Sequence, residues 1–240
     1  GGIGVMTGDD NTCIGANAGE DCVGAAECTA VGRHALGNIT SGNYNTGIGK
    51  DAGRQYYTAN QNVLVGYSAG EYIGIGNNAA THTTVIGMEA GKYATGSKNT
   101  YIGSGAGKGG TTGAPYSTGN SGTAVGYNAL TAQTTGTQNT ALGEQAAYRL
   151  TTGAYNIAVG SIALAGIVTG GHNVAIGYYA AGQVTSGQNN ISLGQNSLAY
   201  STTADDNIAI GQYASHRTGE KIAASNTIVI GKYAGFYNQG

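Results

Sequence analysis

Residues 156–163 read Asn-Ile-Ala-Val-Gly-Ser-Ile-Ala, and residues 173–180 read Asn-Val-Ala-Ile-Gly-Tyr-Tyr-Ala. The second stretch begins 17 residues after the first, and each contains an aliphatic residue followed directly by Gly. The Gly of this pair, here called the anchor Gly, recurs along the chain at Gly15, Gly32, Gly49, Gly66, Gly87, Gly103, Gly126, Gly143, Gly160, Gly177, Gly194, Gly211 and Gly231. Eight of the twelve intervals are 17 residues, which indicates a repeat architecture.

The residues before each anchor Gly alternate in character. The residue directly before it is always aliphatic, and the residue three before it is always β-branched. The residue between these two is small in nine of the thirteen repeats, and it is most often Ala. Alternation with a period of two predicts a short β-strand at this point of every repeat. We expect the small face of the strand to be one that another backbone approaches closely.

The residues after each anchor Gly also follow a pattern. The third residue is Ala in every repeat except one, where it is Ser197, and this predicts tight packing at a second short strand. The two residues before this Ala vary freely, so we expect them to face solvent or a partner. Turns rich in Ser, Thr and Gly follow. Stacked Asn side chains are then expected to satisfy turn backbone groups from coil to coil, at Asn45, Asn139, Asn156, Asn173 and Asn190.

These patterns predict an all-β fold, a parallel β-solenoid (β-roll) of about 13 coils with a mostly 17-residue repeat. A helix is excluded because Gly costs about 1 kcal/mol in a helix interior. We expect one solenoid over residues 1–240, as a segment of a longer fibre, with loop insertions near residues 71–84, 109–121 and 220–224. Because each coil buries little, we expect the small-residue face to join copies of the chain into a homotrimer, the simplest closed arrangement of parallel rods.

Composition excludes several classes of protein. Gly accounts for 45 of 240 residues, without the Gly at every third position that collagen requires. The net charge of −2 and the scattered Lys and Arg residues argue against a nucleic-acid partner, and the apolar stretches are too short to predict a membrane span. The chain does not start with Met, which suggests a mature product or an excised segment. Three Cys residues leave open whether one local disulfide forms.

Two short motifs imitate catalytic sites. Residues 66–70 read Gly-Tyr-Ser-Ala-Gly, the pattern of a serine-hydrolase nucleophile elbow, but Ser68 occupies a variable position of the repeat. Residues 103–108 approximate a phosphate-binding loop whose first Gly is misplaced by one residue. The four His residues fall in different repeat phases. We therefore expect no enzyme activity and no catalytic, cofactor-binding or metal-binding residues.

The 17 tyrosines of the chain are a further feature that can indicate a contact surface. Six of them occupy the variable outward positions: Tyr67, Tyr127, Tyr178, Tyr179, Tyr213 and Tyr233. Two interpretations stay open. Stacked rings can shield the edges of a solenoid, and flat aromatic faces can contact a saccharide or another surface.

Several repeats resemble known attachment proteins. Asn173–Ala181 and Asn207–Ser215 resemble the head repeats of YadA-type trimeric autotransporter adhesins. Asn45–Gly53 and Asn99–Gly107 contain Asn-Thr-x-Ile-Gly-x-x-Ala-Gly, which is closer to repeats of bacteriophage and cyanophage tail-fibre proteins. The resemblance implies a left-handed parallel β-roll trimer used for attachment. The 17-residue period is longer than that of the adhesin repeat, and the sequence shows no coiled-coil stalk, so the fibre resemblance is the stronger one.

The expected function is therefore that of a non-catalytic structural and adhesive fibre segment. We expect an extracellular location in a viral tail fibre, as a shaft or receptor-binding region for host attachment. Its expected partners are two further copies of the chain and a host-surface saccharide or receptor. The alternatives are the head of a bacterial cell-surface adhesin, or a solenoid that binds ice or a glycan. Ice binding would require a Thr ladder along the whole chain, whereas the Thr three residues before the anchor Gly gives way to Ile and Val after Thr140.

Overall fold

The computed structural model describes residues 8–55, 57–73, 80–110, 117–167, 169–215 and 225–236. The chain divides into two compact units, Gly1–Gly122 and Thr123–Gly240. The first unit contains β1 (Thr12–Ile14), β2 (Thr29–Val31), β3 (Thr46–Ile48), β4 (Val63–Val65), β5 (Thr84–Ile86) and β6 (Thr100–Ile102). The second contains β7 (Thr123–Val125), β8 (Thr140–Leu142), β9 (Ile157–Val159), β10 (Val174–Ile176), β11 (Ile191–Leu193), β12 (Ile208–Ile210) and β13 (Ile228–Ile230).

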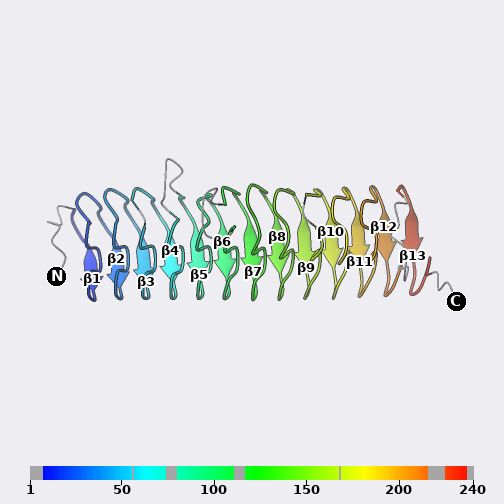
Figure 1. The fold of residues 1–240 in the computed structure, drawn as a ribbon, viewed down its shortest axis with the longest axis horizontal. Helices are drawn as coiled ribbons and strands as arrows, with labels where there is room; N and C mark the ends of the chain where they lie inside the picture. The colour runs from blue at the N-terminus through cyan, green and yellow to red at the C-terminus, as the bar shows by residue number, and fades with distance from the viewer. Residues whose placement is uncertain are drawn as a thin grey trace. The chain divides into compact units, whose positions relative to one another are not determined.

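Within each unit, every strand pairs in parallel with the next strand of the sequence. The arrows of each unit in Figure 1 accordingly point in one direction. Equivalent repeat positions lie opposite each other, as Val174 does to Ile191 and Ile176 to Leu193. The described residues contain no helix. The prediction of an all-β parallel β-solenoid is therefore confirmed, with a strand at every predicted position.

The longer intervals leave this register unchanged. Val63 of β4 pairs with Thr84 of β5, 21 residues later, and Ile208 of β12 pairs with Ile228 of β13, 20 residues later. Extra residues are therefore accommodated outside the strands. The predicted insertions near residues 71–84 and 109–121 lie partly outside the described residues, and the one near 220–224 lies wholly outside them.

The anchor Gly is required by its backbone conformation and by its neighbour. Gly160 has φ +126°, a region that side-chain-bearing residues rarely adopt. A Cβ at Gly160 would lie 2.7 Å from the carbonyl oxygen of Gly177, the anchor Gly of the next coil. The close approach predicted for the small face is thus observed here, between successive coils of one chain.

The predicted Asn ladder is present and buried. The backbone N of Asn156 donates to Oδ1 of Asn139 at 2.9 Å, and Nδ2 of Asn156 donates to the carbonyl of Gly170 at 2.9 Å. Asn173 repeats both bonds one coil later, to Asn156 and to Gly187. Each amide therefore links its own coil to the next, and it satisfies backbone groups that water cannot reach.

The interior of each coil is narrow, and the side chains at two positions fill it together. One is the middle residue of the strand, and the other is the fourth residue after the anchor Gly. In the coil of β6, Tyr101 is fully buried, and a Cβ at Gly107 would overlap its ring. In the coil of β9 the sizes are reversed, with Ala158 in the strand and a fully buried Leu164 opposite. A large residue at one position is thus matched by a small one at the other, as close packing requires.

The Ala three residues after the anchor Gly is buried as predicted, but it does not belong to a strand. Ala163 and Ala180, for example, are fully buried within turns. The expectation of a second short strand at this position is therefore wrong, because the chain there follows a tight turn whose residues alternate between negative and positive φ. The conclusion that this position admits only a small side chain is unaffected.

Candidate interaction surfaces

The flanking residues of each strand point out of the coil. The middle residue of β10, Ala175, is buried, whereas Ile176 beside it is 44% exposed. From β9 to β13 both flanking positions are aliphatic. We call this set the outer strand face; it comprises Ile157, Val159, Val174, Ile176, Ile191, Leu193, Ile208, Ile210, Ile228 and Ile230. Side chains on alternate positions of a strand share one face, so this is a continuous apolar surface.

The side of the strand that is available for association between chains differs from the side expected from the sequence. The sequence led us to expect contact between chains through the small-residue face. That face instead lines the interior of the coil, where Ala158 and Ala175 are fully buried. The physical reason is the narrow width of the coil, whose interior is filled by the middle strand residue and the fourth residue after the anchor Gly, so the flanking side chains of each strand point outward. The surface available to a partner is therefore the aliphatic one.

The six predicted tyrosines are placed at the surface but not in one site. Tyr67, Tyr127, Tyr178 and Tyr233 are exposed, while Tyr179 and Tyr213 are half-buried. Tyr213 and Tyr233 occupy equivalent positions of successive coils and stack, with ring centroids 5.2 Å apart. Tyr178 and Tyr179 lie side by side, with their ring centroids 6.4 Å apart.

Cations accompany two of these tyrosines. Nζ of Lys50 lies 5.2 Å from the ring centroid of Tyr67, and Nζ of Lys232 lies 5.3 Å from that of Tyr233. Stacking and cation–π contacts of this kind cover the ring faces involved. The pair Tyr213 and Tyr233 therefore fits the interpretation that stacked rings shield the coil edges.

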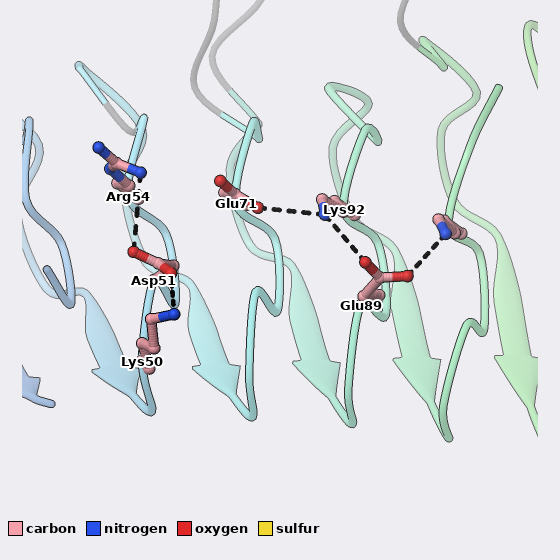
Figure 2. Close-up of polar contacts among 7 residues, drawn as sticks. Lys50, Asp51, Arg54, Glu71, Glu89 and Lys92 are labelled. Carbon is pink, nitrogen blue, oxygen red and sulfur yellow. Dashed lines mark hydrogen bonds and ion pairs between the residues drawn. The ribbon is translucent and has the colours of Figure 1, made fainter. Parts of the chain in front are cut away.

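An ion-pair network in the first unit was not predicted. Nζ of Lys92 lies 3.4 Å from a carboxylate oxygen of Glu71 and 2.9 Å from one of Glu89, while Nζ of Lys108 donates to Glu89 at 2.6 Å. Figure 2 shows this chain of contacts beside a second group, in which Asp51 lies between Lys50 and Arg54. The network joins the coils that follow β4, β5 and β6.

The electrostatics of the network favour the charged forms of Glu89 and Lys92. Hydrogen bonds from Lys108 and Lys92 hold the pKa of the Glu89 carboxyl below its ordinary value. Burial by itself lowers the pKa of Lys92, but the bond to Glu89 and the nearby charge of Glu71 raise it above the ordinary value. The Glu89 carboxylate is thus held ionised between two cations that belong to successive coils, an arrangement that favours the stacking of these coils. The sequence signal was present, since Glu71, Lys92 and Lys108 are each five residues after an anchor Gly.

The structure shows the surroundings of the residues in the two motifs that match catalytic or phosphate-binding patterns. Ser68 is almost completely buried, and within the described residues no hydrogen bond joins it to a His or a carboxylate. Lys108 of the loop-like stretch is held by Glu89. Of the His residues, His172 stacks on Tyr155, with ring centroids 4.8 Å apart, and His216 lies outside the described residues. In the described part of the chain no three His, Cys, Asp or Glu side chains are grouped to hold a metal.

The three cysteines lie in the first two coils as free thiols, so the disulfide that the sequence left open is absent from this structure. Cys22 and Cys28 are buried, and Cys13 is half-buried. Burial raises the pKa of the Cys22 thiol to about 11, and the nearby Cys28 and Cys13 add to this effect. Because the thiolate is the reactive form of Cys, these groups are poor nucleophiles at neutral pH.

Comparison with protein-family models, with curated proteins and with solved structures found no match for this chain. In the part of the chain that the structure describes, no helix has the length and apolar character needed to cross a bilayer. The surfaces described above are therefore the features of the chain that bear on its function.

Proposed function

We propose that this chain is a non-catalytic structural and adhesive segment of an extracellular fibre, in which three copies associate through their outer strand faces. The observation that carries the proposal is the composition of that face, where all ten outward positions of β9 to β13 are aliphatic. A monomeric protein rarely exposes a contiguous apolar surface of this kind, and such a surface marks a site of association.

The shape of the surface suits identical partners. Its side chains stand in two columns with a spacing of about 4.8 Å between strands, which is regular enough to match the same columns of another copy. Closed symmetric assembly buries the apolar face of every copy and leaves none exposed. The number of three copies follows the resemblance of the repeats to trimeric adhesin heads.

A location in a viral tail fibre follows the stronger of the two resemblances, that of Asn45–Gly53 and Asn99–Gly107. In such a fibre the segment would act as a shaft or as part of the receptor-binding region for host attachment. The buried Asn ladder and the ion-pair network support a mechanical role, because both join successive coils, the network doing so in the three coils that follow β4, β5 and β6. Exposed tyrosines then remain available for contact with a host surface.

The association is tested by light scattering on the full chain during size-exclusion chromatography. We expect three times the monomer mass for the native chain. The double variant Ile176→Lys with Ile191→Lys places two charges on the outer strand face and should give a folded monomer. Gln195→Lys adds a charge at a variable exposed position and should remain trimeric. A native chain that is a folded monomer or dimer at tens of micromolar would overturn the proposal.

A further inference from the structure

A cleft of about 390 Å³ opens on the second unit, in the turns that follow the strands. It exists because of a change in size at one repeat position, the fifth residue after the anchor Gly. This residue is Tyr148 in the coil of β8, Ala165 in the next and Gly182 in the one after. The two small residues leave a hollow beside the Tyr148 side chain, and all three line it. Its volume falls within the range of small-molecule sites.

The cleft has aromatic walls, one of which is held in place. Tyr148 and Tyr179 both line it. Nε2 of Gln183 donates to the hydroxyl of Tyr179 at 3.1 Å, and a Cβ on Gly182 would lie 2.7 Å from the Tyr179 ring. The ring therefore rests against the Gly182 backbone and is fixed at its far end. An ordered ring offers a flat contact surface at little cost in conformational entropy.

Among the described residues that line the cleft, Arg149 has the one charged side chain. Arg149 is exposed at the cleft and has no ion-pair partner among the described residues. The described lining residues include no Asp or Glu. The remaining polar groups include the Gln183 amide and the Thr202 hydroxyl, which can donate and accept hydrogen bonds. The Thr185 hydroxyl donates to the Thr202 carbonyl at 2.9 Å and can still accept a hydrogen bond. The cleft thus combines flat aromatic faces, neutral hydrogen-bonding groups and one unpaired guanidinium.

We propose that this cleft binds an acidic saccharide, a sugar unit that bears a carboxylate. The C–H face of a sugar ring fits the electron-rich face of Tyr179 or Tyr148. Sugar hydroxyls match the amide and hydroxyl groups, and the planar guanidinium of Arg149 matches a carboxylate with two parallel hydrogen bonds. None of the lining residues belongs to a strand, so the cleft lies outside the outer strand face. The inference rests on the proposed attachment function and names the ligand class that would serve it.

The test is binding of the full chain to a printed array of carboxylated, sulfated and neutral oligosaccharides. We expect selective binding to at least one carboxylated glycan. Arg149→Gln and Tyr179→Ala should each weaken that binding at least tenfold. The matched control Tyr127→Ala removes an exposed tyrosine outside the cleft and should bind like the native chain.

Several results would overturn the assignment. These are binding to no carboxylated glycan, equal or stronger binding to neutral or sulfated analogues, and unchanged binding by Arg149→Gln. Circular dichroism of each variant shows that its fold is retained, so that a loss of binding reports on the cleft. Light scattering of the same samples separates the two proposals. A trimer that binds no carboxylated glycan would refute the proposed saccharide site and leave the proposed trimer intact.

Discussion

In the coil of β6, the large side chain of Tyr101 is matched by the absence of a side chain at Gly107, and this predicts how substitutions at the two positions affect stability. Tyr101→Ala removes a fully buried ring from the strand of its coil, and Gly107 opposite has no side chain to fill the space. Loss of a buried aromatic ring with an incompletely filled cavity costs about 3 to 5 kcal/mol of unfolding free energy. Gly107→Leu with Tyr101 in place forces a side chain into the ring, and such overpacking costs about 1 to 3 kcal/mol or more.

The double variant should be more stable than Tyr101→Ala alone. It reproduces the pair Ala158 and Leu164, which already occurs in the coil of β9. The backbone is suited to the exchange, since Gly107 has φ +53° and Leu164 has φ +50°. We expect the new Leu to recover about 2 kcal/mol of the loss, so that the two substitutions are strongly coupled.

The assay is urea unfolding followed by circular dichroism, with Tyr127→Ala as the control for loss of an exposed ring. The control should change the unfolding free energy by less than about 0.5 kcal/mol. If the two single effects simply add in the double variant, the side chains do not share one space and the account of the core is wrong.

Three further predictions concern the Asn ladder, the Ala position and the thiols. Asn173→Ala leaves a buried carbonyl and a buried N–H of the next coil without partners, so it should cost about 2 to 5 kcal/mol in urea unfolding. The control Asn189→Gly removes an exposed side chain at a positive φ that Gly tolerates, so it should change little. Ala163→Leu overpacks a buried position, which costs about 1 to 3 kcal/mol, so it should lower the melting temperature markedly. Gln195→Leu, at an exposed position, should lower it only weakly, and equal melting temperatures would show that the Ala position is not buried. Cys22, with its pKa raised to about 11, should react with iodoacetamide slowly at pH 8, and the rate should rise about tenfold per pH unit up to pH 11. Rapid labelling of Cys22 in the folded chain at pH 8, measured by mass spectrometry, would contradict this.

Much of the fold could be predicted from the sequence because every coil contacts only its neighbours. The aliphatic residue and the Gly that follows it, repeated as in Val159-Gly160 and Ile176-Gly177, locate each strand and each close approach of backbones. Asn at a constant distance from them locates the ladder. These features depend on separations within one repeat, so local periodicity contains the information.

The candidate sites were less predictable, for different reasons. Of the six tyrosines selected for their outward positions, only Tyr179 lines the cleft, and Tyr148 and Arg149 were not selected. The hollow appears only when the fifth residue after the anchor Gly is compared across coils. In the same way, the partners Glu71 and Lys92 meet across a coil boundary, where sequence spacing alone does not say that their side chains touch.

The repeat, the parallel order of the strands and the Asn column could all be predicted from spacing along the chain. Which face of each strand lies inside the coil is a property of the folded backbone. Alternation defines two faces without saying which is buried, and hydrophobicity alone favoured burial of the Ile and Val side chains. The tight turns instead bring the opposite wall so close that Ala175 fills the interior while Ile176 points outward. The width of the coil, a property of the folded backbone, thus produces the apolar surface available for association.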